Sequence, residues 1–265
     1  MVNKQRLEGK RIVLTGAAGA IGAAAAEDLR TLGAQVVGID VRLAEGIVPA
    51  DVSDRAQVGQ AMAEAARRLG GIDTLVNCAG IGAAKDAGDY PDDEARRIVD
   101  VNFFGPWNAT AAAMPELLAS RGHVVNVLSG LAMVDVPFAS AYSASKRALE
   151  AYTSALRLEY AGRITVTGLY PGYVPTAIHD RSLEQGVTLE DFAHAETVSQ
   201  VAAAIVGACA RPSRRVTVTP RSAVEFWLAR HWPWAVERFI VARMRASQAR
   251  RDTPSFLRYP EARGG

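Results

Sequence analysis

Short apolar runs alternate with longer segments of helical period along most of the chain. The runs are rich in β-branched residues and almost continuously apolar, which is typical of strands covered on both faces. The predicted strands occupy residues 11–15, 35–40, 47–51, 72–77, 122–128, 163–170 and 214–218. The predicted helices occupy residues 20–32, 54–69, 92–119, 140–160 and 195–210, the second of them capped by Asp54. This alternation predicts parallel strands joined by crossover helices.

The length of the chain and the composition of its last part indicate how it divides. A chain of 265 residues is long enough for one large α/β domain whose core needs no metal or disulfide. We therefore expect residues 1–220 to form one domain that carries the chemistry. Residues 221–265 are rich in Trp and Arg, and we expect an amphipathic extension packed on the same domain or on a partner.

The overall composition excludes several classes of protein. With 49% hydrophobic and 22% charged residues, the chain is not a disordered, collagenous or disulfide-rich protein. Its formal charge of +2 argues against a nucleic-acid partner. Cys78 and Cys209 lie in apolar patterns, so we expect two buried thiols in a reducing compartment and no metal cluster.

The N-terminal segment lacks the features of a targeting sequence. Charged residues lead directly into the first predicted strand, without the apolar region and cleavage site of a signal peptide. The longest uncharged runs contain about fifteen residues and are interrupted by Gly, Pro or Asn, too short for a membrane span. We therefore expect a cytoplasmic protein.

A glycine-rich segment joins the first predicted strand to the first predicted helix. The run TGAAGAIG at 15–22 contains Gly16, Gly19 and Gly22. Glycines allow a tight turn and close approach to a phosphate, and a helix N-terminus supplies unpaired N–H groups and a positive dipole end. The spacing also fits plain helix–strand packing, but its place between a strand and a helix favours a pyrophosphate-binding turn.

An acidic residue ends the second predicted strand. Asp40 follows Gly22 by eighteen residues, close to the spacing at which a carboxylate accepts hydrogen bonds from a dinucleotide ribose. A carboxylate there repels a ribose phosphate, which favours NAD over NADP. Arg42 is the opposing observation, because a guanidinium can hold a phosphate. The structural alternative for Asp40 is a strand-end turn residue.

A tyrosine and a lysine share one face of the helix predicted at 140–160. Tyr142 and Lys146 in YSASK are four residues apart, which brings phenol and ammonium together. A phenol with a pKa near 10 is a poor base at neutral pH, but a nearby cation stabilises the phenolate and is expected to lower that pKa. The pair is thus a candidate for proton exchange with a substrate, and the alternative is a solvated helix face.

Four further motifs add to the glycine-rich run and YSASK: NCAG at 77–80, Asn102 in DVNFFG, Ser129 thirteen residues before Tyr142, and PGYVPT at 171–176. Together these motifs make the chain resemble the short-chain dehydrogenases and reductases, in their single-domain branch. The resemblance covers about residues 9–220 and implies an α/β fold. The sheet would be a Rossmann-type doubly wound parallel sheet with strand order 3-2-1-4-5-6-7 and helices on both faces, here with a C-terminal helical extension. The family commonly forms dimers or tetramers, so we expect a homodimer or homotetramer.

The resemblance also implies a role for each site residue. Tyr142 would be the general acid/base, Lys146 would lower its pKa and hold the nicotinamide ribose, Ser129 would bind the substrate oxygen, and Asn102 would position a proton-relaying water. The remaining residues would contact the cofactor, with NAD favoured over NADP. They are Gly16, Gly19, Ala20 and Ile21 at the pyrophosphate, Asp40 and Val41 at the adenosine ribose, Asp51 and Val52 at the adenine, Asn77 and Ala79 along the cofactor, and Pro171, Gly172, Val174 and Thr176 at the nicotinamide, beside Tyr142 and Lys146.

The chemistry of the central residues can also be argued without the family. Hydride transfer at a carbinol carbon requires a proton donor or acceptor and a second hydrogen bond at the attached oxygen. Tyr142 and Ser129 provide these two groups. We therefore expect an NAD(P)-dependent oxidoreductase that interconverts a secondary alcohol and a ketone.

One departure from the family pattern keeps a second function open, and a third function stays open because the same fold can carry it. Gly19 comes one position earlier than the usual middle glycine, a spacing more typical of sugar-nucleotide epimerases. NCAG replaces NNAG, and Gly130 follows Ser129 where a second serine is usual. An epimerase or dehydratase that retains NAD would need a larger substrate domain than the residues after Pro171 provide. A non-catalytic NAD-sensing regulator would not need Ser129 together with the YSASK pair.

The substrate end is expected beyond the sixth predicted strand. Residues 172–195 follow its carboxyl end, where open α/β sheets bind ligands, and their length suggests a lid. The apolar residues near this end predict a hydrophobic substrate that is steroid-like, lipid-like or aromatic. Those expected to line the pocket are Met133, Val134, Val136, Phe138, Tyr173, Ile178 and Leu183.

The segment from Arg221 onward combines aromatic and basic residues. It holds three of the four tryptophans, Trp227, Trp232 and Trp234, interleaved with arginines. Such a segment can cover a subunit or the mouth of the active site, or lie in a lipid headgroup layer. We expect partner contact or self-packing ahead of a peripheral membrane contact through residues 226–245.

Overall fold

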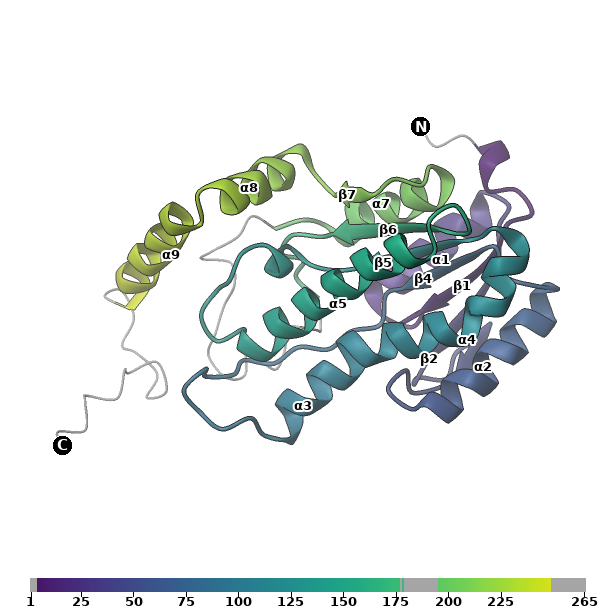
Figure 1. The fold of residues 1–265 in the computed structure, drawn as a ribbon, viewed down its shortest axis with the longest axis horizontal. Coiled ribbons are helices and arrows are strands. Elements are labelled where there is room, and N and C mark those ends of the chain that lie inside the picture. The colour runs from purple at the N-terminus through teal and green to yellow at the C-terminus, as the bar shows by residue number, and fades with distance from the viewer. Residues whose placement is uncertain (1–3, 177, 179–194, 249–265) are drawn as a thin grey trace.

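The computed structural model describes residues 4–176, 178 and 195–248. In this part of the chain seven parallel strands form one sheet in the order β3-β2-β1-β4-β5-β6-β7, which confirms the predicted strand order (Figure 1). The strands are β1 (Arg11–Thr15), β2 (Gln35–Asp40), β3 (Ile47–Pro49), β4 (Thr74–Asn77), β5 (His123–Val127), β6 (Thr165–Tyr170) and β7 (Arg215–Thr217). The α-helices are α1 (Ala20–Thr31), α2 (Arg55–Leu69), α3 (Asp93–Val99), α4 (Gly105–Ser120), α5 (Ser140–Glu159), α7 (Val198–Ala210), α8 (Pro220–His231) and α9 (Pro233–Gln248).

Helices cover both faces of the sheet because successive strand residues point to opposite sides. Val13 faces a core formed with α2, α4 and α5, whereas its neighbours Ile12 and Leu14 face a second core formed with α1 and α7. All three side chains are fully buried. The doubly wound arrangement predicted from the apolar strands is therefore confirmed, and it brings the carboxyl ends of all strands to one edge.

One predicted helix is divided in the structure. Instead of a continuous helix over 92–119, α3 and α4 are joined by a single wide turn at Asp100–Phe104, in which the N–H of Gly105 bonds to the carbonyl of Asp100. Pro106 explains the change, because it has no N–H to donate to the carbonyl four residues earlier, that of Asn102. The predicted cap is confirmed, since the Asp54 carboxylate accepts from the N–H groups of Ala56 and Gln57 at the start of α2.

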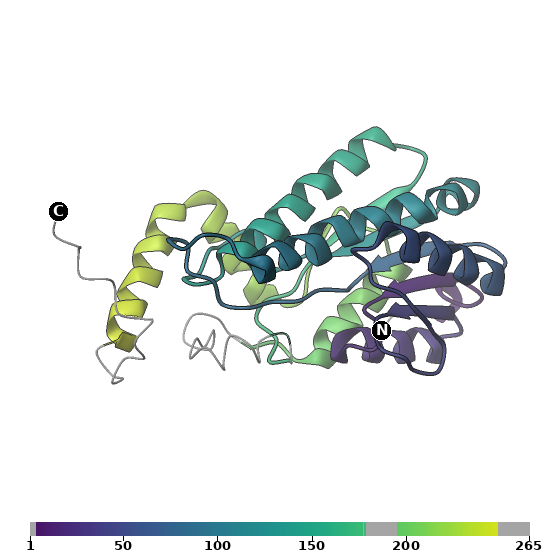
Figure 2. The same ribbon diagram turned by 90° about the horizontal axis from the view of Figure 1, so that it is seen from below.

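The extension beyond β7 forms two helices that project from the sheet. In two perpendicular views α9 lies at the opposite end of the molecule from α2 (Figures 1 and 2). A bend at Trp232 and Pro233 separates α8 from α9, and the side chain of Thr219 caps α8 by accepting from the N–H of Ser222. The extension is helical, as expected for an amphipathic segment.

Candidate active site

A cavity of about 1120 Å³ follows the carboxyl edge of the sheet. It begins at the glycine-rich turn between β1 and α1, passes the ends of β4, β5 and β6, and ends against α8 and α9. Its position agrees with the rule that open α/β sheets bind ligands beyond the carboxyl ends of their strands. The predicted catalytic and cofactor residues line it, with the exceptions of Asn77 and Asn102.

The glycine-rich turn lies against the backbone that follows β4. Gly16 has a φ of +72°, and a Cβ there would lie 2.7 Å from backbone atoms of Ala79. Gly19 is the N-cap of α1 and offers no side chain to its first turn, so the N–H groups there face the cavity without a cap. Gly16, Gly19, Ala20 and Ile21 all line the cavity. This bare helix start, next to a cradle that a Cβ would fill, fits a pyrophosphate.

Asp40 combines both interpretations considered for it. Its carboxylate accepts hydrogen bonds from the N–H groups of Ala18 and Arg42, each at 3.0 Å, so it holds the glycine-rich turn in place. It also lines the cavity at the end of β2, together with Val41. The guanidinium of Arg42 lies 3.5 Å from the same carboxylate and close to Gly19. The two charges considered for cofactor choice are therefore neighbours.

Asp51 and Val52 form the next part of the wall, after β3. The Asp51 carboxylate accepts from the N–H and hydroxyl of Ser53 and pairs with Arg97. Burial alone would raise the pKa of Asp51, but these hydrogen bonds lower it below its usual value. Asp51 is thus ionised and held in place.

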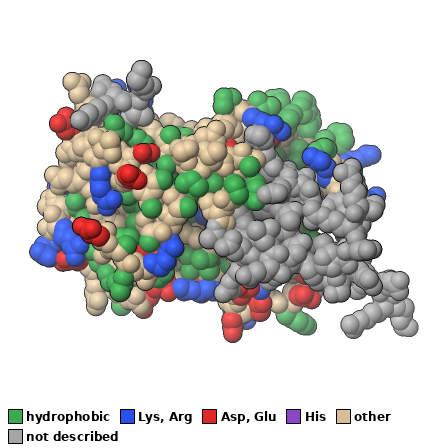
Figure 3. All heavy atoms as spheres, turned by 180° about the vertical axis from the view of Figure 1, so that it is seen from behind, with side chains coloured by type: hydrophobic (Ala, Val, Ile, Leu, Met, Phe, Trp, Pro, Cys, Tyr) green, Lys and Arg blue, Asp and Glu red, His purple; other side chains and the backbone are tan. Residues whose placement is uncertain are grey.

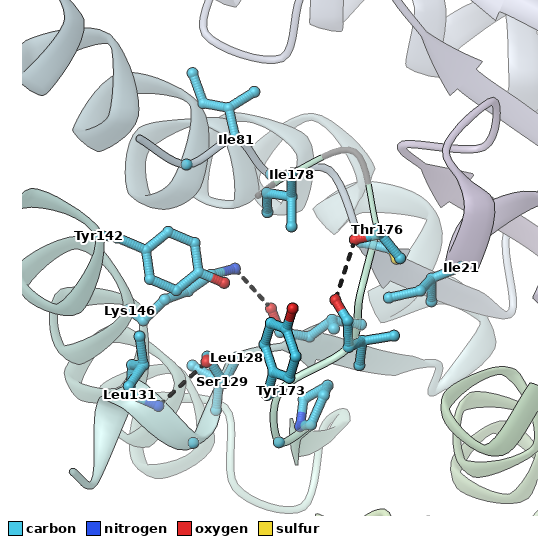
Figure 4. Close-up of a pocket in the computed structure, with 18 of the residues that line it drawn as sticks. Ile21, Ile81, Leu128, Ser129, Leu131, Tyr142, Lys146, Tyr173, Thr176 and Ile178 are labelled. Atoms are coloured by element: carbon cyan, nitrogen blue, oxygen red, sulfur yellow. Dashed lines mark hydrogen bonds between the residues drawn. The ribbon is translucent and has the colours of Figure 1, made fainter. Parts of the chain in front are cut away.

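Ser129, Tyr142 and Lys146 meet in the middle of the cavity (Figure 4). Ser129 follows β5 and accepts from the N–H of Leu131 at 3.1 Å, while Tyr142 and Lys146 project from the first turns of α5. The Lys146 ammonium lies 5.7 Å from the centre of the Tyr142 ring and donates to the carbonyl of Val127 at 3.1 Å. The end of β5 therefore orients both Ser129 and Lys146.

The proton affinities of this pair differ from the expectation. Burial raises the pKa of Tyr142 to about 12, although its hydrogen bond with Ser129 works in the opposite direction. Burial lowers the pKa of Lys146 to about 8. The expected lowering of the phenol pKa by the ammonium is therefore not found in this structure. Desolvation sets the direction, and the hydrogen bond that opposes it comes from Ser129, whereas the Lys146 ammonium donates to a backbone carbonyl.

Asn102 and Asn77 lie behind the cavity wall. Asn102 is fully buried in the wide turn between α3 and α4, where it bonds both backbone groups of Ile81 and the hydroxyl of Ser145. It thus fixes the strip of wall that follows β4. Asn77 is 1% exposed and donates to Thr110 and Asn126, so its side chain belongs to the core and does not reach the cofactor end of the cavity.

The nicotinamide and substrate residues divide into two groups. Pro171, Gly172, Val174 and Thr176 line the cavity as expected, and so do Ala79, Val134, Val136, Tyr173 and Ile178. Met133 and Phe138 do not line it. Met133 packs against the buried cluster of Leu128 and Leu149. Leu183 and most of the predicted lid at 172–195 lie outside the described residues.

The end of the cavity at α8 and α9 is lined by residues that the motifs did not identify. The inner faces of α8 and α9 contribute a mainly apolar wall. Its residues are Arg221, Ser222, Glu225, Phe226, Leu228, Trp232, Ala235, Val236, Phe239, Ile240 and Arg243. The spacing of 235, 236, 239, 240 and 243 on one helical face is the sequence pattern that predicts such a wall.

Comparison with known proteins connects this geometry to a family. A family profile described as short chain dehydrogenase matches residues 10–186. A dehydrogenase/reductase SDR family protein 7-like of Anopheles gambiae is 32% identical over 256 residues, which cover 85% of this chain and 80% of that protein.

Two crystal structures share the fold across most of both chains. A short chain dehydrogenase from Burkholderia cenocepacia in complex with NADP is 26% identical, with a TM-score of 0.75. The match covers 88% of this chain and 98% of that one. A short chain dehydrogenase/reductase from Burkholderia phymatum in complex with NAD is 25% identical, with a TM-score of 0.76, covering 84% and 93%. The chain belongs to the short-chain dehydrogenase family of oxidoreductases.

Proposed function

We propose that this protein interconverts a secondary alcohol and a ketone with NAD, acting on a hydrophobic substrate. The observation that carries the proposal is the meeting of Ser129, Tyr142 and Lys146 inside one cavity. One end of this cavity is a bare helix start suited to a pyrophosphate, and the other end is mainly apolar. A proton-transferring group thus stands between a place for a dinucleotide and a place for an apolar molecule.

The site residues divide the chemistry among themselves. The nicotinamide ring supplies the hydride acceptor or donor. In alcohol oxidation Tyr142, as phenolate, takes the proton that leaves the substrate oxygen, and in ketone reduction its hydroxyl returns it. Ser129 donates a second hydrogen bond to the same oxygen. The Lys146 ammonium stabilises the phenolate by its charge and is held by the Val127 carbonyl.

The proposed preference for NAD rests on Asp40. Its carboxylate is 7% exposed and lines the cavity, where it would repel a ribose phosphate. Arg42 is exposed and already lies beside that carboxylate, so it offsets the repulsion only in part. We expect a lower KM for NAD than for NADP, and we expect Arg42→Ala to weaken NADP use more than NAD use.

A panel of substrates tests the proposal. Hydroxysteroids, fatty and aromatic alcohols and sugars are each incubated with NAD and with NADP while reduced nicotinamide is followed by absorbance. Turnover of the apolar alcohols is expected, with kcat reduced about 10³-fold in Tyr142→Phe, because general acid–base catalysis contributes roughly 10² to 10⁴. The matched control is Tyr90→Phe, which removes a hydroxyl from a fully exposed tyrosine outside the cavity and should leave kcat unchanged.

Each contrary result has a definite meaning. Activity on small polar polyols alone would contradict the hydrophobic substrate. Unchanged turnover in Tyr142→Phe would contradict the whole assignment of the site. Binding of NAD by the folded protein without turnover of any substrate in the panel would favour a sensing role instead.

A further inference from the structure

Helix α9 carries apolar side chains on two opposite sides. Ala235, Val236 and Ile240 point into the cavity wall. At 100° per residue, Trp234 and Val241 lie on the opposite side of the helix, in line with Arg238 and Arg245. Trp234 is 62% exposed and Val241 39% exposed. A helix with apolar side chains on both sides needs a cover for its outer face as well as for its inner one.

Helix α8 repeats this arrangement. Phe226 and Ser222 lie toward the cavity, whereas Val224 and Trp227 lie on the other side with Arg230. Val224 is 58% exposed and Trp227 51% exposed. We call the outward residues of the two helices the α8–α9 outer face: Val224, Trp227, Arg230, Trp234, Arg238, Val241 and Arg245. Seen from behind, hydrophobic and basic side chains lie next to each other at this end of the molecule (Figure 3).

The charge of the chain is divided unevenly along its length. Residues 221–265 contain nine arginines and four acidic residues, a formal charge of +5. Residues 1–220 contain 21 basic and 24 acidic residues, a formal charge of −3. Arg238 and Arg245 on the outer face form no ion pair with any residue in the described ranges. The basic charge of this end is therefore available to an anionic partner.

We propose that the α8–α9 outer face docks on the surface of an anionic lipid bilayer. Tryptophans between arginines suit the headgroup layer, where the rings enter the acyl boundary and the guanidinium groups meet lipid phosphates. A second copy of the chain fits this face less well, because its +5 segment would meet another +5 segment. The contact is peripheral, since no helix in the described part of the chain is long and apolar enough to cross a bilayer.

Docking would bring the mouth of the cavity to the lipid. Trp232 and Phe239 both line the cavity and are 49% and 57% exposed, so they form its rim. The Trp232 ring packs edge-on against Trp227 of the outer face, with the ring centres 5.5 Å apart. If the substrate is apolar, which rests on the proposed function, it can pass from the bilayer into the cavity beside this tryptophan pair.

Vesicle binding tests the docking. The full chain is mixed with vesicles of phosphatidylcholine alone or with 30% phosphatidylglycerol, and bound protein is measured by co-sedimentation. Binding to the anionic vesicles is expected, and it should weaken as salt is added. Arg238→Gln/Arg245→Gln should bind about 30-fold more weakly, at about fivefold for each arginine near an anionic surface. Trp227→Ala/Trp234→Ala should weaken binding to vesicles of either composition.

Two matched variants control for loss of surface residues elsewhere. Arg55→Gln/Arg211→Gln removes two exposed arginines from α2 and the end of α7, and Tyr90→Ala/Leu158→Ala removes two exposed apolar side chains outside the outer face. Both should bind like the unchanged protein. Absence of binding to anionic vesicles at low salt overturns the proposal, and so does equal binding by all four variants. Conversion of an oligomer into monomers by the outer-face variants, measured by light scattering, would assign the face to a second copy instead.

A second readout separates this proposal from the proposed function. With a water-soluble alcohol, the outer-face variants should keep the kcat/KM of the unchanged protein, and they should lose turnover only when an apolar alcohol is embedded in anionic vesicles. Soluble turnover without vesicle binding overturns the docking and leaves the proposed function standing. Vesicle binding without turnover of any alcohol or ketone contradicts the proposed function and leaves the docking standing.

Discussion

The two ends of the cavity differ in what forms their walls. At the glycine-rich end the wall is backbone, with Gly16 pressed against Ala79 and the turn tied to Asp40 by hydrogen bonds. At the α8–α9 end the wall consists of side chains such as Phe226 and Ile240, carried by helices that contact the sheet mainly near β7. Backbone pinned between strands cannot move aside, whereas a side chain can change rotamer and a terminal helix can shift. We therefore expect the glycine-rich end to be intolerant of substitution and the helical end to be adjustable.

The largest effect is expected where a methyl group meets backbone. A Cβ at Gly22 would collide with the carbonyl of Gly16, so Gly22→Ala should lower the free energy of unfolding by about 3 kcal/mol and abolish NAD binding. Gly59→Ala in α2 is the matched control, since a Cβ there has no neighbour within 4 Å. It should raise stability by about 0.5 to 1 kcal/mol, because Ala favours the helix. Urea unfolding and NAD titration measure both, and a stable, NAD-binding Gly22→Ala would show that this end is not rigid.

The proton-transfer pair between the two ends should give a pH profile with a bend near 8. The reactive state of the pair has a phenolate on Tyr142 and an ammonium on Lys146. Below the Lys146 pKa of about 8, the population of this state rises tenfold with each pH unit. Above it, loss of the lysine proton cancels this gain, so that the population becomes constant until the Tyr142 pKa of about 12. The kcat/KM for alcohol oxidation should therefore rise with unit slope up to about pH 8 and then level off.

Replacing the lysine should remove that bend. In Lys146→Met only Tyr142 titrates, so kcat/KM should keep rising above pH 8, and at pH 7 it should be about 100-fold below that of the unchanged protein. A bend that persists at pH 8 in Lys146→Met would show that another group produces it. Stopped-flow or steady-state rates between pH 6 and 10 are sufficient.

A buried carboxylate connects the loop after β6 to the α8–α9 end of the cavity. Glu196 is 2% exposed and accepts from the N–H of Gly172 at 2.8 Å and from the hydroxyls of Thr219 and Ser222, at the start of α8. Glu196→Ala leaves three donors without this acceptor, so we expect a loss of about 2 kcal/mol of stability. Because the loop at Gly172 and helix α8 would loosen together, the KM values for NAD and for the substrate should rise together. Glu196→Gln keeps one acceptor oxygen and should recover part of both, and a rise in only one KM would contradict the connection.

The residues at the two ends of the cavity could be predicted from the sequence to different extents. The turn residues follow from a local pattern, because a glycine run between a strand and a helix restricts the backbone within a few residues. The strand order, in contrast, is what the family resemblance implies. The helical spacing of residues 235–243 indicates one apolar face, but it does not show what that face covers, because this depends on where the helices settle after the turn. The expected lowering of the Tyr142 pKa is wrong, because spacing along the helix shows that Lys146 is a neighbour but not that both groups are buried. Gly105 and Pro106 indicate the split of the helix predicted at 92–119, but the apolar periodicity continues through them and favours one continuous helix.

The smallest effect is expected where a new methyl group meets a side chain. A Cβ at Gly130 would lie 2.6 to 2.7 Å from the Phe226 ring of α8, as close as the Cβ at Gly16 lies to the backbone of Ala79. The ring and its helix can move, so Gly130→Ala should lower the free energy of unfolding by only about 1 kcal/mol and leave the KM for NAD unchanged, while the KM for a bulky apolar substrate changes severalfold. Phe226→Leu in the same chain should relieve the strain and restore much of the stability, measured as a double-mutant cycle in urea. A cost as large as that of Gly22→Ala, without rescue by Phe226→Leu, would mean that α8 is held as firmly as the glycine-rich turn and that the two ends of the cavity do not differ.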